Sequence, residues 1–154
     1  MKRSKKEWFL IVFFVWATLK SAGSIYGYET VSDYAILSHV GAPWAFFPIN
    51  GLIMLIELCT AILLVIRNSY SFMSGTALAV LAAANGAFIT ALSINNIELI
   101  KSIYIASREA RGMTVNQGQL ETMMSQQSLI VILIAYVVFY AFLVWVIKRV
   151  NNEV

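Results

Sequence analysis

Hydrophobic residues fall in four long blocks along the chain, and charged residues gather between them. The blocks cover residues 8–27, 47–66, 72–93 and 129–147. Each is close to the roughly 20 helical residues that span a hydrocarbon core about 30 Å thick. Because lipid offers no partner to an unpaired backbone, the pattern predicts helices rather than open strands. We expect an all-α fold, a polytopic membrane four-helix bundle in which residues 1–154 form a single membrane domain.

The first block also has features of a secretory signal peptide. It follows a basic start at residues 2–6, and the small residues Ser21, Ala22 and Gly23 lie near its end. Lys20 would stand beside the cleavage site, which argues against processing. We therefore interpret residues 8–27 as a retained membrane helix.

Lys and Arg residues cluster on one side of the predicted bundle. They occur at residues 2–6, at Arg67, and at Lys148 and Arg149, which share one side if the chain crosses four times. The positive-inside rule makes that side cytoplasmic. We expect a multi-pass protein of the bacterial inner (plasma) membrane with both termini in the cytoplasm.

Two external segments then join the spans. Residues 31–40 have apolar positions at helical spacing, after a capping-box variant that runs from Thr30 to Asp33. This pattern predicts a short amphipathic helix on the outer surface, acting either as a structural lid over the bundle or as a substrate gate. Aromatic residues follow it and predict an interfacial anchor at Trp44, Phe46 and Phe47.

The second external segment, residues 94–128, continues the helical spacing of the third block beyond the membrane. Gly112 interrupts the pattern, and Thr114 can cap a new helix that leads into the fourth block. The simplest arrangement is an extended hairpin of the third and fourth helices with its tip near residues 111–114. The alternative is a segment that lies flat on the membrane.

Four polar side chains interrupt the blocks at similar depth, and we call them the polar layer. Ionisable groups in a spanning helix cost about 2.5–3.5 kcal/mol or more, so Lys20 and Glu57 require an explanation. The helical rise places them about 11 and 15 Å below the outer boundary, with Asn85 and Tyr136 at about 12 and 11 Å. The layer predicts either a site for a polar headgroup, a proton or an ion, or a structural salt bridge between Lys20 and Glu57. Further polar side chains able to extend this network are Asn50, Thr60 and Tyr140.

Small residues recur at every fourth position of the third block, and we call them the small-residue stripe. Such a stripe lets another helix approach closely, either within the same bundle or in a second protomer. Its members are Gly75, Ala79, Ala83, Ala87 and Ala91.

Composition excludes several classes of function. The chain is 60% hydrophobic and only 12% charged, whereas soluble domains are nearer one quarter charged. The single Cys59 allows no internal disulfide, and the single His39 cannot supply both axial ligands of a membrane b-type haem. A phosphate loop, a metal-spaced His/Glu set and a nucleophile elbow are absent from the sequence. We therefore expect no catalytic residues, no metal site, no intrinsic cofactor and no nucleic-acid partner.

Five sequence elements stand around Lys20 and Glu57, namely Ala17-Thr-Leu-Lys20, Gly41-Ala-Pro43, Gly51-Leu-Ile-Met-Leu-Ile-Glu57, Ala61-Ile-Leu-Leu64 and Arg67. In these elements the chain resembles the DoxX-like family of four-helix membrane proteins, which includes the DoxD and MauE relatives. The resemblance covers residues 8–92 and implies a membrane component tied to respiratory or redox chemistry, such as a quinone-linked oxidoreductase subunit, or a maturation factor. It implies that Lys20 and Glu57 form the intramembrane pair.

Three classes of function fit these patterns. The leading hypothesis is a non-catalytic subunit or assembly factor of a membrane complex, with other membrane subunits or a second copy as partners within the lipid bilayer. The second is a quinone- or lipid-binding redox subunit whose polar layer holds the headgroup. The third is an oligomeric ion- or proton-coupled transporter or channel, or a membrane sensor, in which Glu57 responds to the ion and Lys20 tends to neutralise it.

Overall fold

The computed structural model of the chain describes residues 3–109 and 112–152, and its regular structure there is entirely helical. Four of its helices are long and apolar enough to cross a membrane. The all-α membrane bundle expected from the hydrophobic blocks is therefore confirmed. The four helices are α1 (Lys5–Tyr26), α3 (Phe46–Val65), α4 (Tyr70–Asn95) and α7 (Gln126–Asn152).

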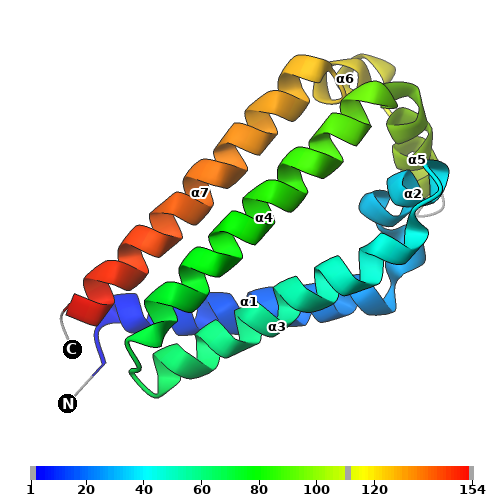
Figure 1. Cartoon of the computed structure of the whole chain (residues 1–154). Coiled ribbons are helices and arrows are strands. Elements are labelled where there is room, and N and C mark those ends of the chain that lie inside the picture. The colour runs from blue at the N-terminus through cyan, green and yellow to red at the C-terminus, as the bar shows by residue number, and fades with distance from the viewer. Residues whose placement is uncertain (1–2, 110–111, 153–154) are drawn as a thin grey trace.

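These four helices form two pairs that diverge like the arms of a wedge (Figure 1). α1 packs along α3, and α4 packs along α7, while a tight turn at residues 66–69 joins α3 to α4. That turn, the start of α1 and the end of α7 all lie at the narrow end of the wedge (Figure 1). The two pairs separate toward the opposite end, which we call the wide end.

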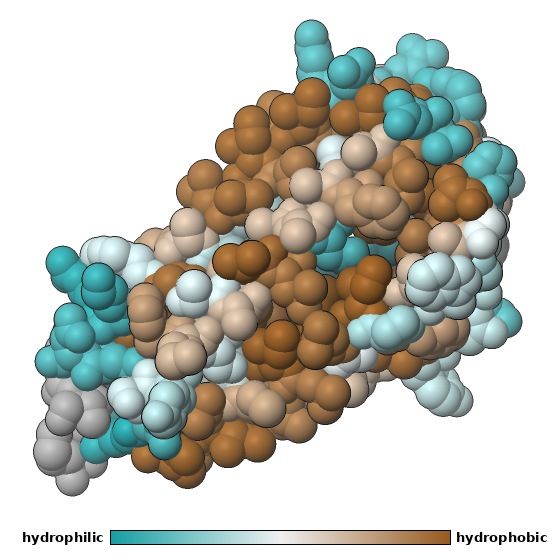
Figure 2. Space-filling model, in the orientation of Figure 1, coloured by the Kyte–Doolittle hydropathy of each residue, from teal (hydrophilic) through white to brown (hydrophobic). Residues whose placement is uncertain are grey.

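The hydrophobic core lies where the two pairs meet. Leu10 and Phe14 of α1, Leu78 of α4 and Leu143 and Ile147 of α7 belong to one cluster and are each at most 1% exposed. Nearer the wide end, most side chains of α7 are exposed. The outer surface is correspondingly hydrophobic over most of the view in Figure 2, as expected for a surface that faces lipid.

Short helices close the wide end and connect the two pairs. The α2 helix (Ser32–His39) packs against α5 (Ile97–Glu109), and its Ile36 and Leu37 are both 2% exposed. Because α2 follows α1 and α5 follows α4, this contact joins one arm of the wedge to the other (Figure 1). The elements involved are η1 (Tyr28–Thr30), α2 (Ser32–His39), η2 (Pro43–Ala45), α5 (Ile97–Glu109) and α6 (Gln117–Met123).

The external segment 94–128 is largely helical, but it does not extend α4 and α7 as two straight arms. The chain turns at Asn96, and α5 folds back toward α2 instead of continuing α4 (Figure 1). Ile100 of α5 is 7% exposed, so this turn gives the apolar face of α5 a surface to pack on. The expected hairpin tip includes residue 111, which lies outside the described residues.

Both predicted caps in the external segments are wrong by one or two residues. Helix α2 begins after Val31 without a side-chain cap, because the Thr30 hydroxyl instead donates a hydrogen bond of 2.9 Å to the carbonyl of Gly27. Helix α6 is capped by Asn116 rather than Thr114, and the Asn116 side chain accepts a hydrogen bond of 3.2 Å from the backbone of Gln119. Thr30 belongs to the preceding 3-10 turn, which uses its hydroxyl locally.

Helix α4 contacts its neighbours along a line that differs from the small-residue stripe. Four residues turn an α-helix by about 400°, so a strict four-residue repeat drifts by about 40° at each step. Gly75 lies at the interface, where an added Cβ would stand 2.5 Å from Cδ1 of Ile147. Farther along the stripe, Ala87 and Ala91 are exposed. Ala79 and Ala83 are half-buried, and the buried positions of α4 are Ser71, Gly75, Leu78, Ala82 and Ser93.

Candidate functional site

The four residues of the polar layer line one cavity between the diverging helix pairs. We call it the polar cavity, and its volume is about 460 Å³. Figure 2 shows a hollow between α3 and α4 with a hydrophilic interior surrounded by hydrophobic surface. Each long helix contributes one member of the layer to the lining, namely Lys20 from α1, Glu57 from α3, Asn85 from α4 and Tyr136 from α7.

Glu57 is the most buried ionisable group of the cavity, with a residue exposure of 4%. Its Oε2 accepts a hydrogen bond of 2.8 Å from the hydroxyl of Ser21 in α1. Phe14 and Ala17 are buried on α1, and Ser21 follows Ala17 by one helical turn. The face of α1 that packs toward α3 therefore presents a hydroxyl, and not the lysine, to the Glu57 carboxylate.

The expected salt bridge between Lys20 and Glu57 is not formed. Both residues are among those described, and no nitrogen–oxygen pair joins them within 4.0 Å. Lys20 is exposed, and its Nζ lies 5.5 Å from the ring centroid of Trp16, one turn earlier. Neighbouring residues of a helix point about 100° apart, so Lys20 faces away from the direction in which Ser21 reaches Glu57. The ammonium and the carboxylate share a cavity without direct contact.

Asp33 is a lining residue that the sequence did not suggest for this site. It lies in the first turn of α2 and contributes a second carboxylate to the polar cavity. Burial raises the pKa of Asp33 above its usual range, and a hydrogen bond from the Ser32 hydroxyl at 3.3 Å partly opposes this. The capping pattern that begins at Thr30 assigned Asp33 a local role, and only the fold of α2 over the wide end places it here.

A second cavity, of about 380 Å³, lies under α2 and α5 and is also lined by Asp33. Arg108 of α5 lines it too and donates hydrogen bonds to the Tyr104 hydroxyl at 2.8 and 3.0 Å. Because both cavities include Asp33, they adjoin at this residue. Asp33 therefore lies between the two cavities, on the side of the polar cavity that faces the wide end.

Aromatic side chains border the polar cavity where α1 approaches α7. The rings of Phe13 and Phe139 meet edge to face with centroids 5.5 Å apart. Trp16 also lines the cavity and is 57% exposed, so this side opens toward the surface that lipid would cover. Tyr136 fits closely against α4, because an added Cβ at Gly86 would lie 3.3 Å from Cε1 of its ring.

The other polar residues suggested by the sequence divide between the cavity and the helix interface. Asn50 and Tyr140 line the cavity. The Tyr136 and Tyr140 hydroxyls are 3.5 Å apart, at the outer limit of a hydrogen bond. Thr60 is fully buried elsewhere, and its hydroxyl lies 2.7 Å from that of Ser74 in a contact between α3 and α4.

The predicted interfacial anchor separates into buried and exposed members. Trp44 is 73% exposed and Phe47 is 42% exposed, whereas Phe46 is fully buried. The Phe46 ring packs edge to face against Tyr34 of α2, with centroids 5.5 Å apart. Phe46 therefore fastens α2 to the start of α3, while Trp44 remains on the surface.

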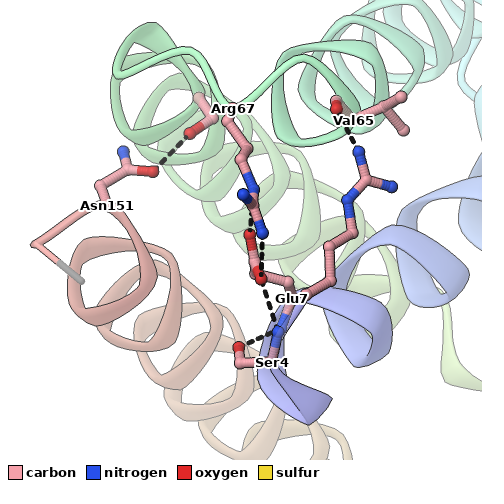
Figure 3. A network of polar contacts seen from close by, with 7 residues as sticks. Ser4, Glu7, Val65, Arg67 and Asn151 are labelled. Atoms are coloured by element: carbon pink, nitrogen blue, oxygen red, sulfur yellow. Dashed lines mark hydrogen bonds and ion pairs between the residues drawn. The ribbon is translucent and has the colours of Figure 1, made fainter. Parts of the chain in front are cut away.

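The narrow end is closed by an ion pair that the sequence analysis missed (Figure 3). Glu7 is 5% exposed, and its carboxylate accepts hydrogen bonds from Arg67 at 2.9 and 3.2 Å. The same carboxylate accepts a hydrogen bond of 2.6 Å from the backbone of Ser4, whose hydroxyl caps the start of α1. The spacing of Ser4 and Glu7 before an apolar run is a capping-box signal that could have identified Glu7.

Further contacts tie the end of α7 and the α3–α4 turn into this region (Figure 3). The Asn151 amide donates a hydrogen bond of 3.1 Å to the carbonyl of Ser69 and accepts one of 3.0 Å from the Ser71 hydroxyl. Arg3 donates a hydrogen bond to the carbonyl of Val65. Three segments distant in sequence are therefore held together at the narrow end, opposite the open cavities.

Within the described residues, no group of three or more His, Cys, Asp or Glu side chains is placed to hold a metal ion. The single Cys59 is exposed on the outer surface of α3 and does not line the polar cavity. The chemistry offered by the site is therefore that of hydroxyl, amide, carboxylate and ammonium groups inside an aromatic and aliphatic border. Comparisons of the chain with protein-family models, with curated proteins and with solved structures found no match.

Proposed function

We propose that this four-span membrane protein binds a lipophilic molecule with a hydrogen-bonding head, either a quinone or a lipid, and that the head occupies the polar cavity. The observation that supports the proposal is the convergence of one polar side chain from each spanning helix on a cavity of about 460 Å³. This volume falls within the range of about 300–1,000 Å³ that is typical of small-molecule sites.

The hydrogen bonding inside the cavity favours a ligand site over a purely structural network. Polar groups in a membrane are costly unless they are paired, so a structural network pairs its members with one another. Glu57 is bonded to Ser21, but Lys20 and Asn85 form no hydrogen bond with any described residue. Both can donate to a quinone carbonyl or a lipid phosphate.

The exposed aromatic border supports lateral access from the bilayer. A quinone or lipid carries an apolar tail that must stay in the hydrocarbon region while its head enters the protein. Trp16 is 57% exposed and Phe139 is 40% exposed, and both line the cavity. The tail would leave the cavity between α1 and α7, beside these rings.

The DoxX-like resemblance belongs to the same proposal. In that reading Lys20 and Glu57 are the ligand-facing pair of a non-catalytic subunit within a quinone-linked redox complex. We also infer that the narrow end faces the cytoplasm of a bacterial inner membrane. Lys5, Arg67 and Arg149 support this orientation, because they belong to the segments gathered at that end.

A quinone titration of the protein in nanodiscs tests the proposal. A short-chain quinone is expected to quench tryptophan fluorescence saturably, and Trp16→Phe is expected to remove most of this signal. Asn85→Leu should weaken binding about tenfold, the equivalent of roughly 1.4 kcal/mol. Asn95→Leu is the matched control, since Asn95 is exposed near the end of the same helix and does not line the cavity.

Equal affinities in Asn85→Leu and Asn95→Leu would count against this site. A second arm identifies the natural ligand by solvent extraction of gently purified protein and mass spectrometry. A co-purified quinone or phospholipid that is depleted in Asn85→Leu, but retained in Asn95→Leu, supports the proposal and distinguishes the two ligand classes.

A second candidate is a proton- or ion-coupled transporter. It is favoured by the absence of an ion pair between Lys20 and Glu57, both described residues, and by the second cavity that adjoins the site at Asp33. Proton or ion flux across liposome membranes that disappears in the Glu57→Gln variant, with assembly of the protein intact, would support this function. A wild-type protein that shows no flux would reject it.

A further inference from the structure

We propose that the groove between the start of α1 and the end of α7 binds an anionic phospholipid. This groove has a volume of about 330 Å³ and lies at the narrow end, away from the polar cavity. Three basic residues line it, namely Lys5, Lys6 and Arg149. We call it the basic groove.

The charge of the basic groove suits an anion. Among the described residues, its lining includes no carboxylate. Glu7, the acidic residue nearest to these lysines on α1, is buried and bound to Arg67. The Arg149 guanidinium stacks over the ring of Trp145 at 4.5 Å from its centroid, which holds the cation at the rim of the groove. A phosphate at this rim would meet basic side chains from two different helices.

The floor of the groove is apolar, which suits an acyl chain rather than a free anion. Phe9 of α1 is 50% exposed, and Phe142 and Trp145 of α7 are 49% and 50% exposed. The Phe142 and Trp145 rings stack with centroids 5.9 Å apart and form a continuous surface. An inorganic phosphate would gain nothing from this surface, whereas a lipid tail lies along it.

A second groove extends the apolar surface along α1 and has the length of a lipid tail. It shares Lys5 and Phe9 with the basic groove and reaches Trp16. The 11 helical steps from Lys5 to Trp16 correspond to about 17 Å. One leaflet of a hydrocarbon core about 30 Å thick is about 15 Å deep. A headgroup at Lys5 therefore places its acyl chain along the full length of this surface.

Native mass spectrometry of the full chain, titrated with phosphatidylglycerol, tests the proposal. The double variant Lys5→Gln/Arg149→Gln should lose about fivefold in affinity for each cation removed. Lys148→Gln is the matched control, because Lys148 is a neighbouring exposed cation on α7 that does not line the groove. This control should bind as tightly as wild type.

Two further arms separate the sources of binding. Phosphatidylcholine with the same acyl chains should bind more weakly to wild type and should not distinguish the double variant from the control. Inorganic phosphate in excess should not displace phosphatidylglycerol. The proposal is overturned if both lipids bind equally, if the double variant matches Lys148→Gln, or if phosphate competes. Because these residues are exposed, unchanged thermal unfolding of each variant verifies that folding is intact.

Discussion

Glu57 of α3 accepts a hydrogen bond of 2.8 Å from Ser21 of α1. The donor is the residue after Lys20, which is the partner expected from its opposite charge. This one-residue offset determines the chemistry of the polar cavity. Lys20 stays exposed beside Trp16, so the cavity keeps both an ammonium and a carboxylate that are not paired with each other. A bound head can therefore meet a donor and an acceptor on the same wall.

Removing the Ser21 hydroxyl should destabilise the protein. Ser21→Ala leaves a buried Glu57 without its hydrogen-bond donor, which typically costs about 1–3 kcal/mol. Thermal or denaturant unfolding in detergent measures the change. Ser24→Ala is the matched control, because Ser24 lines the same cavity without bonding to Glu57, and its effect should be within about 0.5 kcal/mol. Equal losses in the two variants would show that Ser21 does not support Glu57.

Breaking the ion pair at the narrow end should loosen the whole bundle. Glu7→Gln is expected to cost about 2 kcal/mol, between the values typical of exposed and buried pairs, because Glu7 is buried while the Arg67 side chain is 23% exposed. Glu98→Gln is the control, because it removes a carboxylate from the exposed ion pair with Lys101. It should leave the free energy of unfolding unchanged. A Glu7→Gln protein as stable as wild type would mean that hydrophobic packing alone holds the narrow end together.

The backbone at Arg67 allows a sharper version of this test. Arg67 has a φ of +55°, a conformation that glycine adopts at lower cost. Arg67→Gly should nevertheless destabilise the protein, since losing the contacts to Glu7 outweighs the relief of backbone strain. An Arg67→Gly protein more stable than wild type would show that relief of backbone strain outweighs the loss of the contacts to Glu7.

The close approach of α4 and α7 should depend on Gly75. Gly75→Val forces a branched side chain against Ile147 and should cost about 1–3 kcal/mol by overpacking. Ala91→Val, on the exposed part of the same helix, should have little effect. A double-mutant cycle gives an internal check, because Ile147→Val removes the atom that an alanine at position 75 would meet. Ile147→Val should therefore cost less in the Gly75→Ala background than in wild type.

Asp33 should make the protein less stable as the pH rises. Burial raises the pKa of Asp33, so the folded state holds this proton more tightly than the unfolded chain. The resulting stabilisation is complete below the ordinary pKa of the carboxyl and is lost as the pH rises through the raised value. Asp33→Asn should unfold at a higher temperature than wild type at neutral pH and should lose this advantage in acid. Identical pH profiles for wild type and Asp33→Asn would contradict the prediction.

The polar cavity should admit water-soluble reagents. In a Cys59→Ala background in nanodiscs, Asn85→Cys should react with a charged methanethiosulfonate reagent, because the cavity adjoins a second one toward the wide end at Asp33. Val80→Cys is the control, since Val80 is 65% exposed on the same helix and would face lipid. Similar rates at the two positions would indicate that the cavity is closed to solution.

The hydropathy pattern alone predicted the four long apolar helices and their approximate lengths, and it predicted similar depths for the four polar residues that line one cavity. Membrane thickness sets the length of a span, and a constant rise per residue converts position into depth. These quantities depend only on distance along one helix, so no knowledge of the neighbouring helices is needed to read them from the chain.

Only the tertiary structure decided which side chains meet. The direction of a side chain around its helix depends on the packing partners, which is why Ser21 rather than Lys20 reaches Glu57. Glu7 and Arg67 are 60 residues apart, and their pairing depends on the packing of α1 along α3, which brings the start of α1 beside the α3–α4 turn. The fold of α2 brings Asp33 over the cavity. The order of residues along one helix predicts the depth of each side chain. Contacts between helices depend instead on how each helix is rotated about its axis and on which helices are neighbours, and the free energy of packing determines both.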